Sequence, residues 1–172
     1  MKICFISDFA NDGGAATAAD RVARSLHQAG NDIYRISGNA PASSILSEHS
    51  LQESRKLQLL TVLAGSKLLA IARGLRKYDL LRQARKALAI IKPDFVSLHN
   101  IHGTDWPIEL AEVALDQCPT SWTLHDCSSF LGSHYPEYCT KATKESLSRL
   151  EKFWHGISSH KSKTQFSFIA PS

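Results

Sequence analysis

The sequence predicts an α/β domain in which a parallel β-sheet is covered by helices on both faces. Short, nearly continuous apolar runs alternate along the chain with longer segments whose apolar residues recur at helical spacing. Strands that alternate with helices form parallel sheets, because each crossover is right-handed and lays its helix over the sheet. With 172 residues, 43% of them hydrophobic, the chain is long enough for one compact domain with a core.

The first 37 residues predict a complete strand-helix-strand unit. Residues 2–7 form an apolar run typical of a buried strand, and residues 12–29 carry alanine, valine and leucine at helical spacing. Gly30 follows that helix in the position that favours glycine. Residues 32–37 are the next expected strand. Proline, serine and glycine then indicate a loop over residues 38–50.

The remainder of the chain continues the alternation. The expected elements are, in order, two helices within 51–91 that break near Gly74, a strand at 94–99, a helix at 107–116, a strand at 119–125, a helix at 143–157 and a fifth strand at 165–170.

Positive charge is concentrated in residues 51–92. This basic segment has ten lysines and arginines against two acidic residues, a net charge of +8, although the whole chain carries only +4. Leucine-rich helices with basic residues indicate either a solvated outer face or a helix lying on an anionic membrane surface. Lys67 and Arg73 interrupt the apolar stretch, so we do not expect it to span a membrane. Aromatic residues do not interleave with the basic ones, which disfavours nucleic acid as a partner.

The start of the chain and its thiols indicate a cytoplasmic protein. The apolar run after Met1 is too short for a signal peptide. Cys4, Cys118, Cys127 and Cys139 show no disulfide framework. Reduced thiols are therefore expected.

A zinc site is a weaker interpretation of the same residues. Cys127, His134 and Cys139 follow His125 and are residue types that bind zinc. Their spacing contains no CxxC pair, so we expect no bound metal. A small metal-dependent hydrolase is kept as an alternative that rests on this cluster alone.

Polar residues gather where the predicted strands end. In parallel α/β sheets, ligands bind beyond the carboxyl ends of the strands, where the strand order reverses. Gly13 and Gly14 separate the first strand from its helix, so a ligand can approach the backbone closely and an anion can bind the helix amides. A tight turn that binds nothing is the other interpretation. There is no third glycine of a GxGxxG pattern, which disfavours a dinucleotide site.

Two histidine-containing loops are expected at the same edge. His99-Asn-Ile-His102-Gly follows the third strand, and Leu124-His125-Asp126 follows the fourth. Histidine beside a carboxylate can orient a substrate hydroxyl or move a proton. A loop histidine on its own is often a packing or surface residue. Two such loops beside a Gly-Gly loop favour a shared binding cleft.

The ordered motifs resemble the amino-terminal domain of family 4 retaining glycosyltransferases. They are Asp12-Gly-Gly-Ala-Ala-Thr-Ala-Ala19, Leu98-His-Asn-Ile-His-Gly103, Trp122-Thr-Leu-His-Asp126 followed by Phe130, Gly132 and Tyr135, and Ile169-Ala-Pro-Ser172. The branch that builds colanic acid and other cell-envelope exopolysaccharides is the most similar. The resemblance covers nearly the whole chain and is weakest over residues 38–92. It implies one half of a GT-B fold, in which two Rossmann-like domains face a cleft.

The resemblance also implies roles. The first domain mainly contacts the glycan or lipid-linked acceptor, and the second binds the nucleotide-sugar from which a hexosyl group is transferred. No cofactor and no metal are implied beyond that donor. The implied catalytic residues are His125, beside the transferred sugar, and Asp126, and the implied substrate-binding residues are Gly13, Gly14, Ala15, Asn100, His102 and Gly132.

The sequence departs from the family in two places. Ser128 and Ser129 replace the Trp-Ala that usually follows the His-Asp motif. Residue 172 falls where the family enters its second domain, so residues 1–172 are expected to lack the donor-binding domain and to be inactive without it in cis or in trans. A stand-alone module that binds a glycan, a phosphate or a protein through the same cleft is the main alternative.

Overall fold

The described part of the computed structural model contains a parallel β-sheet. It comprises residues 1–10, 12–38, 47–51, 59, 62, 66–101, 106–125 and 166–169. Within these residues the sheet has six strands in the order β3-β2-β1-β4-β5-β6, all parallel to their neighbours. In chain order the strands are β1 Lys2–Ile6, β2 Asp32–Ser37, β3 Ser47–Ser50, β4 Phe95–Leu98, β5 Thr120–Thr123 and β6 Phe166–Ile169.

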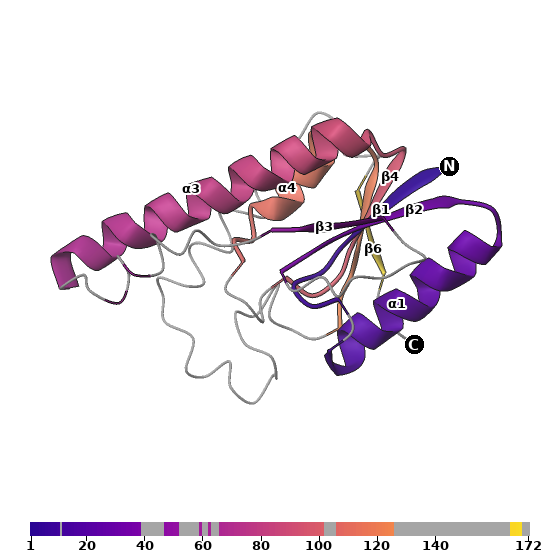
Figure 1. The fold of residues 1–172 in the computed structure, drawn as a ribbon, viewed down its shortest axis with the longest axis horizontal. Coiled ribbons are helices and arrows are strands. Elements are labelled where there is room, and N and C mark those ends of the chain that lie inside the picture. Colours follow the sequence, from indigo (N-terminus) through magenta and orange to yellow (C-terminus); the bar gives the residue numbers. More distant parts are fainter. Residues whose placement is uncertain are drawn as a thin grey trace.

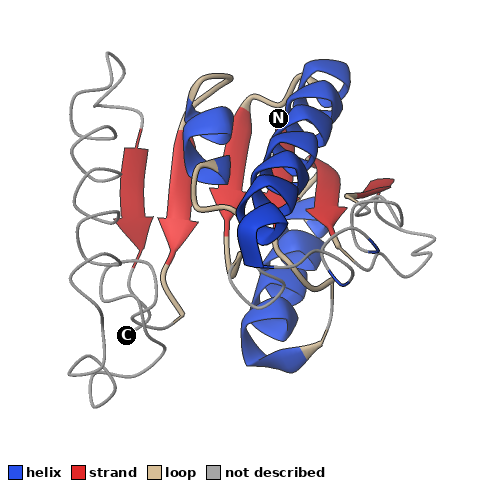
Figure 2. Cartoon of the chain, turned by 90° about the vertical axis from the view of Figure 1, so that its left-hand side faces the viewer, coloured by secondary structure: helices blue, strands red, loops and turns tan. Residues whose placement is uncertain are grey.

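Helices cover both faces of this sheet. Helix α1, Gly13–Gln28, lies on one face, and α3, Ser66–Ile91, lies with α4, Leu110–Leu115, on the other (Figure 1). Figure 2 shows the strand arrows running in one direction, with α3 crossing in front of them. The predicted α/β, Rossmann-like class is therefore confirmed.

The alternation of side chains along each strand produces two hydrophobic cores. On the α1 face, Ile3, Phe5 and Ile33 pack with small alanines of the helix, Ala19 and Ala23. On the opposite face, the buried residues of the sheet pack against α3 and α4; they include Cys4, Ile6, Ile36, Val96, Leu98, Leu80, Ala84, Leu88 and Leu110. Strands buried on both faces explain the nearly continuous apolar runs in the sequence.

The strand order reverses beside β1. After β1 the chain adds β2 and β3 on one side, then returns to pair β4 with the other side of β1. Ile6 is the register partner of both Ile36 in β2 and Leu98 in β4. The switch point, where open α/β sheets bind ligands, therefore lies at the carboxyl ends of β1 and β4.

The predicted break near Gly74 is wrong. Helix α3 continues through Gly74 to Ile91. A glycine inside a helix costs only about 1 kcal/mol relative to alanine, which burial of the helix can offset. Residues after Gly74, including Leu80, Ala84 and Leu88, provide that burial. In Figure 1 the first half of α3 extends to the left, away from the strands of the sheet.

Strand β3 is a second correction, because residues 38–50 were expected to form a loop. Its sequence, Ser47-Glu-His-Ser50, has no apolar alternation. It forms because the edge of β2 offers backbone groups that pair Tyr34 with Ser47 and Ser37 with Ser50.

The other predicted strands and the helix at 107–116 are present with slightly shorter bounds. The predicted helix at 143–157 lies outside the described residues. None of the helices in the described part combines the length and the apolar character that spanning a bilayer requires.

Candidate functional site at the carboxyl ends of the strands

Backbone hydrogen bonds tie the loops together at the switch point. The Asp8 amide, just after β1, donates to the Asn100 carbonyl after β4 at 2.8 Å, and the Gly38 amide after β2 donates to the Asp8 carbonyl at 3.0 Å. Asp8 is buried, and its carboxylate accepts from the Phe9 amide at 2.9 Å. A Cβ added at Gly38 would lie 3.0 Å from the Asp8 oxygen. The three strand ends therefore form one closely packed platform.

The loop after β1 opens into solvent where α1 begins. Gly13 has φ +85°, a conformation that favours glycine. Gly14 has no such φ, and a Cβ added at either glycine would meet nothing within 4 Å. Asp12 makes no side-chain capping hydrogen bond, and the first turn contains no acidic residue. The turn thus explains Gly13, whereas neither backbone conformation nor packing explains Gly14.

A histidine pair lies at the ends of β4 and β5, where His99 is buried and His125 is partly buried. Nδ1 of His99 lies 3.0 Å from Nε2 of His125, and the two rings stack with centroids 5.3 Å apart. The His99 ring also stacks on Phe5 with centroids 5.6 Å apart, and its Nε2 lies 3.2 Å from Oγ of Ser97. The pair is therefore held by the central strands.

His99 is a neutral group in this setting. Its burial is the largest cause that lowers its pKa, to about 4, and the nearby His125 and Arg35 lower it further in the same direction. His125 is the less buried ring of the pair.

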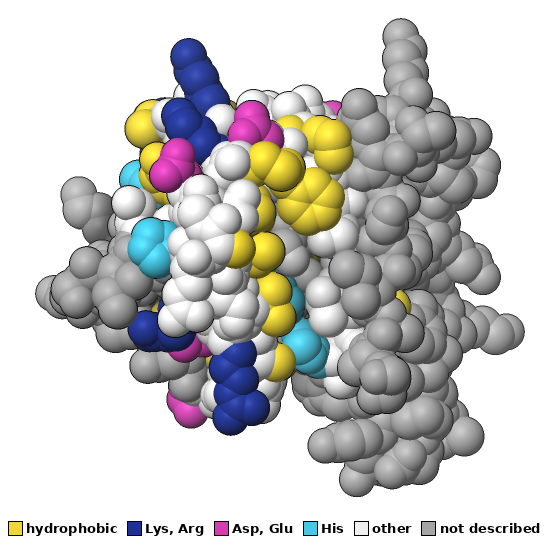
Figure 3. All heavy atoms as spheres, turned by 90° about the vertical axis from the view of Figure 1, so that its right-hand side faces the viewer, with side chains coloured by type: hydrophobic (Ala, Val, Ile, Leu, Met, Phe, Trp, Pro, Cys, Tyr) yellow, Lys and Arg dark blue, Asp and Glu magenta, His cyan; other side chains and the backbone are white. Residues whose placement is uncertain are grey.

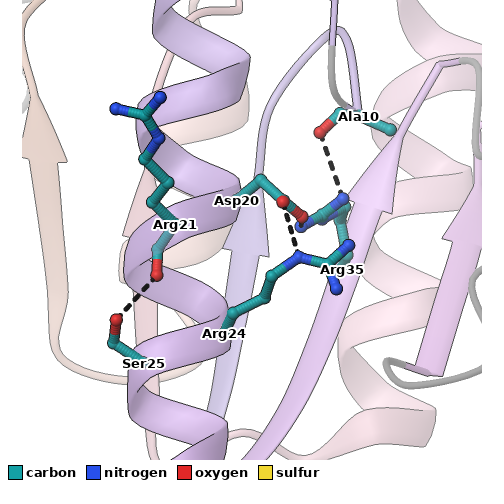
Figure 4. A network of polar contacts seen from close by, with 6 residues as sticks. All are labelled: Ala10, Asp20, Arg21, Arg24, Ser25 and Arg35. Carbon is teal, nitrogen blue, oxygen red and sulfur yellow. Dashed lines mark hydrogen bonds and ion pairs between the residues drawn. The ribbon is translucent and has the colours of Figure 1, made fainter.

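A buried arginine, Arg35, connects β2 to α1 and to Ala10 in the loop between β1 and α1 (Figure 4). Arg35 in β2 places one nitrogen 2.5 Å from the Asp20 carboxylate in α1 and donates from another to the Ala10 carbonyl at 3.1 Å. Arg24 binds the second Asp20 oxygen at 2.7 Å. Burial alone would raise the pKa of Asp20, but the hydrogen bonds from Arg24 and Arg35 outweigh it and lower that pKa. The network joins β2, α1 and the loop.

Two buried hydroxyls in this region have no hydrogen-bond partner among the residues that the structure describes. Ser7 follows β1 and Ser37 ends β2; both are at most 2% exposed. Strand alternation places both on the α1 face, with Phe5 and Arg35. A buried hydroxyl without a partner costs about 1–3 kcal/mol.

The sequence-predicted site residues fall into two groups. Gly13, Gly14 and Ala15 begin α1, Asn100 follows β4 and His125 follows β5, so all five lie at the carboxyl edge of the sheet. The predicted residues that lie outside the described part are Asp126, His102 and Gly132.

Two site residues were missing from the prediction. His99 stands in the histidine motif after the third predicted strand, but only Asn100 and His102 of that motif were predicted as site residues. Asp8 directly follows an apolar run, and a carboxylate in that position was the available signal. In the described part of the chain, no three His, Cys, Asp or Glu side chains are grouped to hold a metal ion. The zinc candidates Cys127, His134 and Cys139 lie outside it.

Charges on the α1 side of the molecule do not mark a binding surface. On the face shown in Figure 3, lysine and arginine side chains are scattered together with aspartate and glutamate.

The chain is similar to solved structures that include the following two proteins. MurG from Acinetobacter baumannii matches over 83% of the chain with 13% identity and a TM-score of 0.49. The Bordetella bronchiseptica enzyme WbmH, in complex with NAD+, matches over 98% with 9% identity and a TM-score of 0.48. The chain spans 40% of the length of the first protein and 55% of the second. No protein-family model and no curated protein matches the sequence. Likenesses at this level assign neither a family nor an activity.

Proposed function

We propose that this chain is the acceptor-side, amino-terminal domain of a GT-B glycosyltransferase that moves a hexosyl group from a nucleotide-sugar to a glycan or lipid-linked acceptor, with retention. The observation that carries the proposal is Gly14, which is exposed at a helix start beside the switch point. Neither φ nor packing requires a glycine there. A ligand that lies close to the backbone would leave no room for a side chain, and this explains a glycine at position 14.

The proposed roles follow from position. Amides at Gly13, Gly14 and Ala15 bind phosphate oxygens of the donor, because unpaired N–H groups and the helix dipole favour an anion. His125 contacts the transferred sugar, with Asp126 as its neighbour. The proposed acceptor-side residues are Asn100, His102 and Gly132.

The chemistry assigned to this domain is binding and electrostatic stabilisation. Fixed hydrogen-bond donors stabilise the charge that develops as the nucleoside diphosphate leaves. A second Rossmann-like domain supplies the remaining donor contacts. No cofactor and no metal are part of the proposal.

A non-catalytic binding module is the second candidate. It is favoured by the composition of the described site, which offers backbone amides, a neutral His99 and an arginine already paired with Asp20. These groups bind ligands without requiring chemistry.

The test is transfer by the full-length gene product that contains these residues. We expect acceptor-dependent release of nucleoside diphosphate from one member of a nucleotide-sugar panel, with retained anomeric configuration by NMR. His125→Ala should lower kcat about 100-fold or more, the scale of losing one preorganised donor. His27→Ala, at the exposed far end of α1, is the matched control. Binding of a glycan or sugar phosphate without turnover of any donor would favour the binding module.

We also propose that the domain acts in the cytoplasm, at the inner face of the plasma membrane, with α3 on the lipid surface. Leu68, Ile71, Leu75 and Tyr78 are 49–64% exposed, and their spacing of three, four and three residues aligns them as an outer stripe. Ile71 lies nine residues before the buried Leu80, which at 100° per residue is the opposite side of the helix.

Basic residues continue the outer stripe toward the end of α3. Arg82, Arg85 and Lys86 are exposed there, and Arg82 also pairs with Asp79 at 3.0 Å. Lys77 pairs with Glu109 of α4. Exposed leucine and isoleucine beside arginine and lysine suit the interface of an anionic leaflet.

A further inference from the structure

We propose that Ser7 and Ser37 together bind one neutral O–H group, whose oxygen atom is shared by the two serine hydroxyls. The group is either a buried water molecule or a hydroxyl of a bound ligand, and the experiment distinguishes these two sources. With a ligand hydroxyl, the inference rests on the binding site proposed above and adds a contact to it. With water, it is independent of that function.

The two serines are neighbours across the sheet. Each comes one residue after a pair of register partners of β1 and β2. The backbone pairing continues past them, since the Ser7 amide donates to the Ile36 carbonyl at 3.1 Å and the Gly38 amide to the Asp8 carbonyl at 3.0 Å. Adjacent strands lie about 4.8 Å apart, and register partners share one face of the sheet. Two hydrogen bonds of about 2.8 Å to a common oxygen can span that distance.

Both hydroxyls are buried and unpaired. Ser7 is 2% exposed and Ser37 is 0% exposed. Neither Oγ atom has a hydrogen-bond partner among the described residues. A serine hydroxyl can donate one hydrogen bond and accept two, and leaving it buried without any of them is unfavourable. Because the two unpaired hydroxyls are adjacent, a single bound oxygen accounts for both.

The hydrophobic core on the α1 face does not extend to this pair. Its sheet residues are Ile3, Phe5 and Ile33, all of which come earlier in their strands. On the other side of Ser7 lies another polar residue, His99, whose amide donates to the carbonyl before Ser7 at 2.9 Å. The pair therefore belongs to a polar row at the carboxyl ends of the strands. Buried water molecules and ligand hydroxyls both require such polar partners.

The surrounding charges favour a neutral group over an anion. A buried anion needs a compensating positive charge. Arg35 is a buried cation on the same face, two residues before Ser37, but it is already paired with Asp20 at 2.5 Å. The carboxyl group of Asp8, directly after Ser7, is itself buried and adds no positive charge. An O–H group needs none, since it can donate to one serine and accept from the other.

The experiment is a double-mutant cycle measured by urea denaturation of the 172-residue chain. If both hydroxyls hold one water molecule, Ser7→Ala and Ser37→Ala should each lower the denaturation midpoint. The reference is Thr120→Val, which removes a buried hydroxyl that donates to the Cys118 carbonyl at 3.0 Å, and the losses should be comparable. The double variant should lose less than the sum of the single losses, because both substitutions remove contacts to the same oxygen. Ser25→Ala, at an exposed serine of α1, should not lower the midpoint.

A ligand hydroxyl would give a different pattern. Both alanine variants should then be at least as stable as the unmodified chain, because an unpaired hydroxyl has been removed. The probes are the methyl α- and β-glycosides of glucose, galactose and mannose. At least one of them should raise the midpoint of the unmodified chain, since a ligand that binds only the folded state stabilises it, and should leave the midpoint of the double variant unchanged.

Three results would overturn the proposal. The first is alanine variants that are at least as stable as the unmodified chain when no glycoside shifts any midpoint. The second is strictly additive losses, which would give each hydroxyl a partner of its own. The third is a rise of the midpoint with inorganic phosphate that the double variant lacks, which would identify an anion. A shared oxygen in a protein that transfers no sugar would leave the inference standing and refute the glycosyltransferase function, whereas additive losses in an active enzyme would do the reverse.

Discussion

Arg35 and Asp20 form an ion pair that joins the sheet to α1, with 2.5 Å between guanidinium nitrogen and carboxylate oxygen. The Arg35 side chain is only 5% exposed, and it also donates to the Ala10 carbonyl. Removing one partner of a buried pair leaves the other without compensation. We expect Arg35→Met to lower the free energy of unfolding by about 2–3 kcal/mol, somewhat less than for a fully buried pair.

Arg24 provides the matched comparison on the same carboxylate. Its side chain is 45% exposed, so water can replace its contact with Asp20. Arg24→Met should cost less than about 1 kcal/mol. Chemical denaturation measures both variants. Equal losses of unfolding free energy in the two variants would show that the burial of Arg35 does not strengthen its contribution to stability.

Stability should fall at acidic pH because of His99. Its pKa is 6.5 in the unfolded chain and about 4 in the folded one. Above pH 6.5 neither state binds the proton, so His99 has no effect. Between pH 6.5 and 4 only the unfolded state binds it, and stability falls by up to about 3 kcal/mol.

His99→Asn removes that proton uptake. Between pH 7 and pH 4 the unmodified chain should therefore lose about 3 kcal/mol more of its free energy of unfolding than His99→Asn does. Urea denaturation at each pH measures both values. His27→Asn should leave the profile of the unmodified chain intact. A constant difference between His99→Asn and the unmodified chain over this range would contradict the prediction.

Gly13 and Gly14 should respond differently to alanine. Gly13→Ala forces a side chain into φ +85° and should cost about 1–2 kcal/mol of stability. Gly14→Ala meets no atom within 4 Å and should leave stability unchanged or raise it by up to about 1 kcal/mol. If a ligand approaches this backbone, Gly14→Ala should still lower kcat/KM at least about 10-fold, since one misplaced contact costs about 1.4 kcal/mol. Unchanged kinetics in Gly14→Ala would remove the main support for the proposed site.

The outer stripe of α3 should attach the chain to anionic vesicles. Replacing Arg82, Arg85 and Lys86 by Gln removes about 1 kcal/mol each, roughly a hundred-fold loss of binding in total. Replacing Leu68, Ile71 and Leu75 by Ser should weaken binding as well, and added salt should weaken binding of the unmodified chain. Co-sedimentation measures each case.

The control for α3 lies on α1. Arg21→Gln with Val22→Ser removes one basic residue and one exposed apolar side chain from the opposite face of the sheet, and it should bind vesicles normally. Equal binding to neutral and anionic vesicles would contradict the proposal. So would concentration-dependent dimers that disappear in the Leu68, Ile71 and Leu75 variant, because they would identify a second copy of the chain as the occupant.

Most of the fold could be predicted because burial leaves a periodic signal. Strand β1 is covered on both faces and appears as an apolar run, and α1 buries a regular row of alanines. Strand β3 left no such signal, because an edge strand of four polar residues is stabilised by backbone pairing with β2. Gly74 led to a predicted helix break that is absent. The local cost of a glycine in a helix is outweighed by the packing of Leu80 and Leu88 on the sheet.

The loop residues of the candidate site could be predicted from the sequence, whereas the contacts of its buried residues could not. Gly14 and His125 stand in short motifs at strand ends, where the sequence marks them. The pairing of His99 with His125 depends on the lateral order of β4 and β5, which no local pattern encodes. The same holds for Arg35, a charge in an otherwise apolar strand whose partner, Asp20, lies on a different element.

The position of β1 at the centre of the sheet also constrains how the protein folds. Its pairing with β2 closes a loop of about thirty residues, whereas its pairing with β4 joins residues more than ninety apart, as Ile3 and Phe95 show. Longer loops cost more entropy to close, so the β1-α1-β2 unit is expected to form early and β4 and β5 to dock later. The Gly-Gly loop and the Arg35 ion pair belong to the early unit. The two histidines arrive with the late strands, so a folding intermediate would present the loop without the histidine pair.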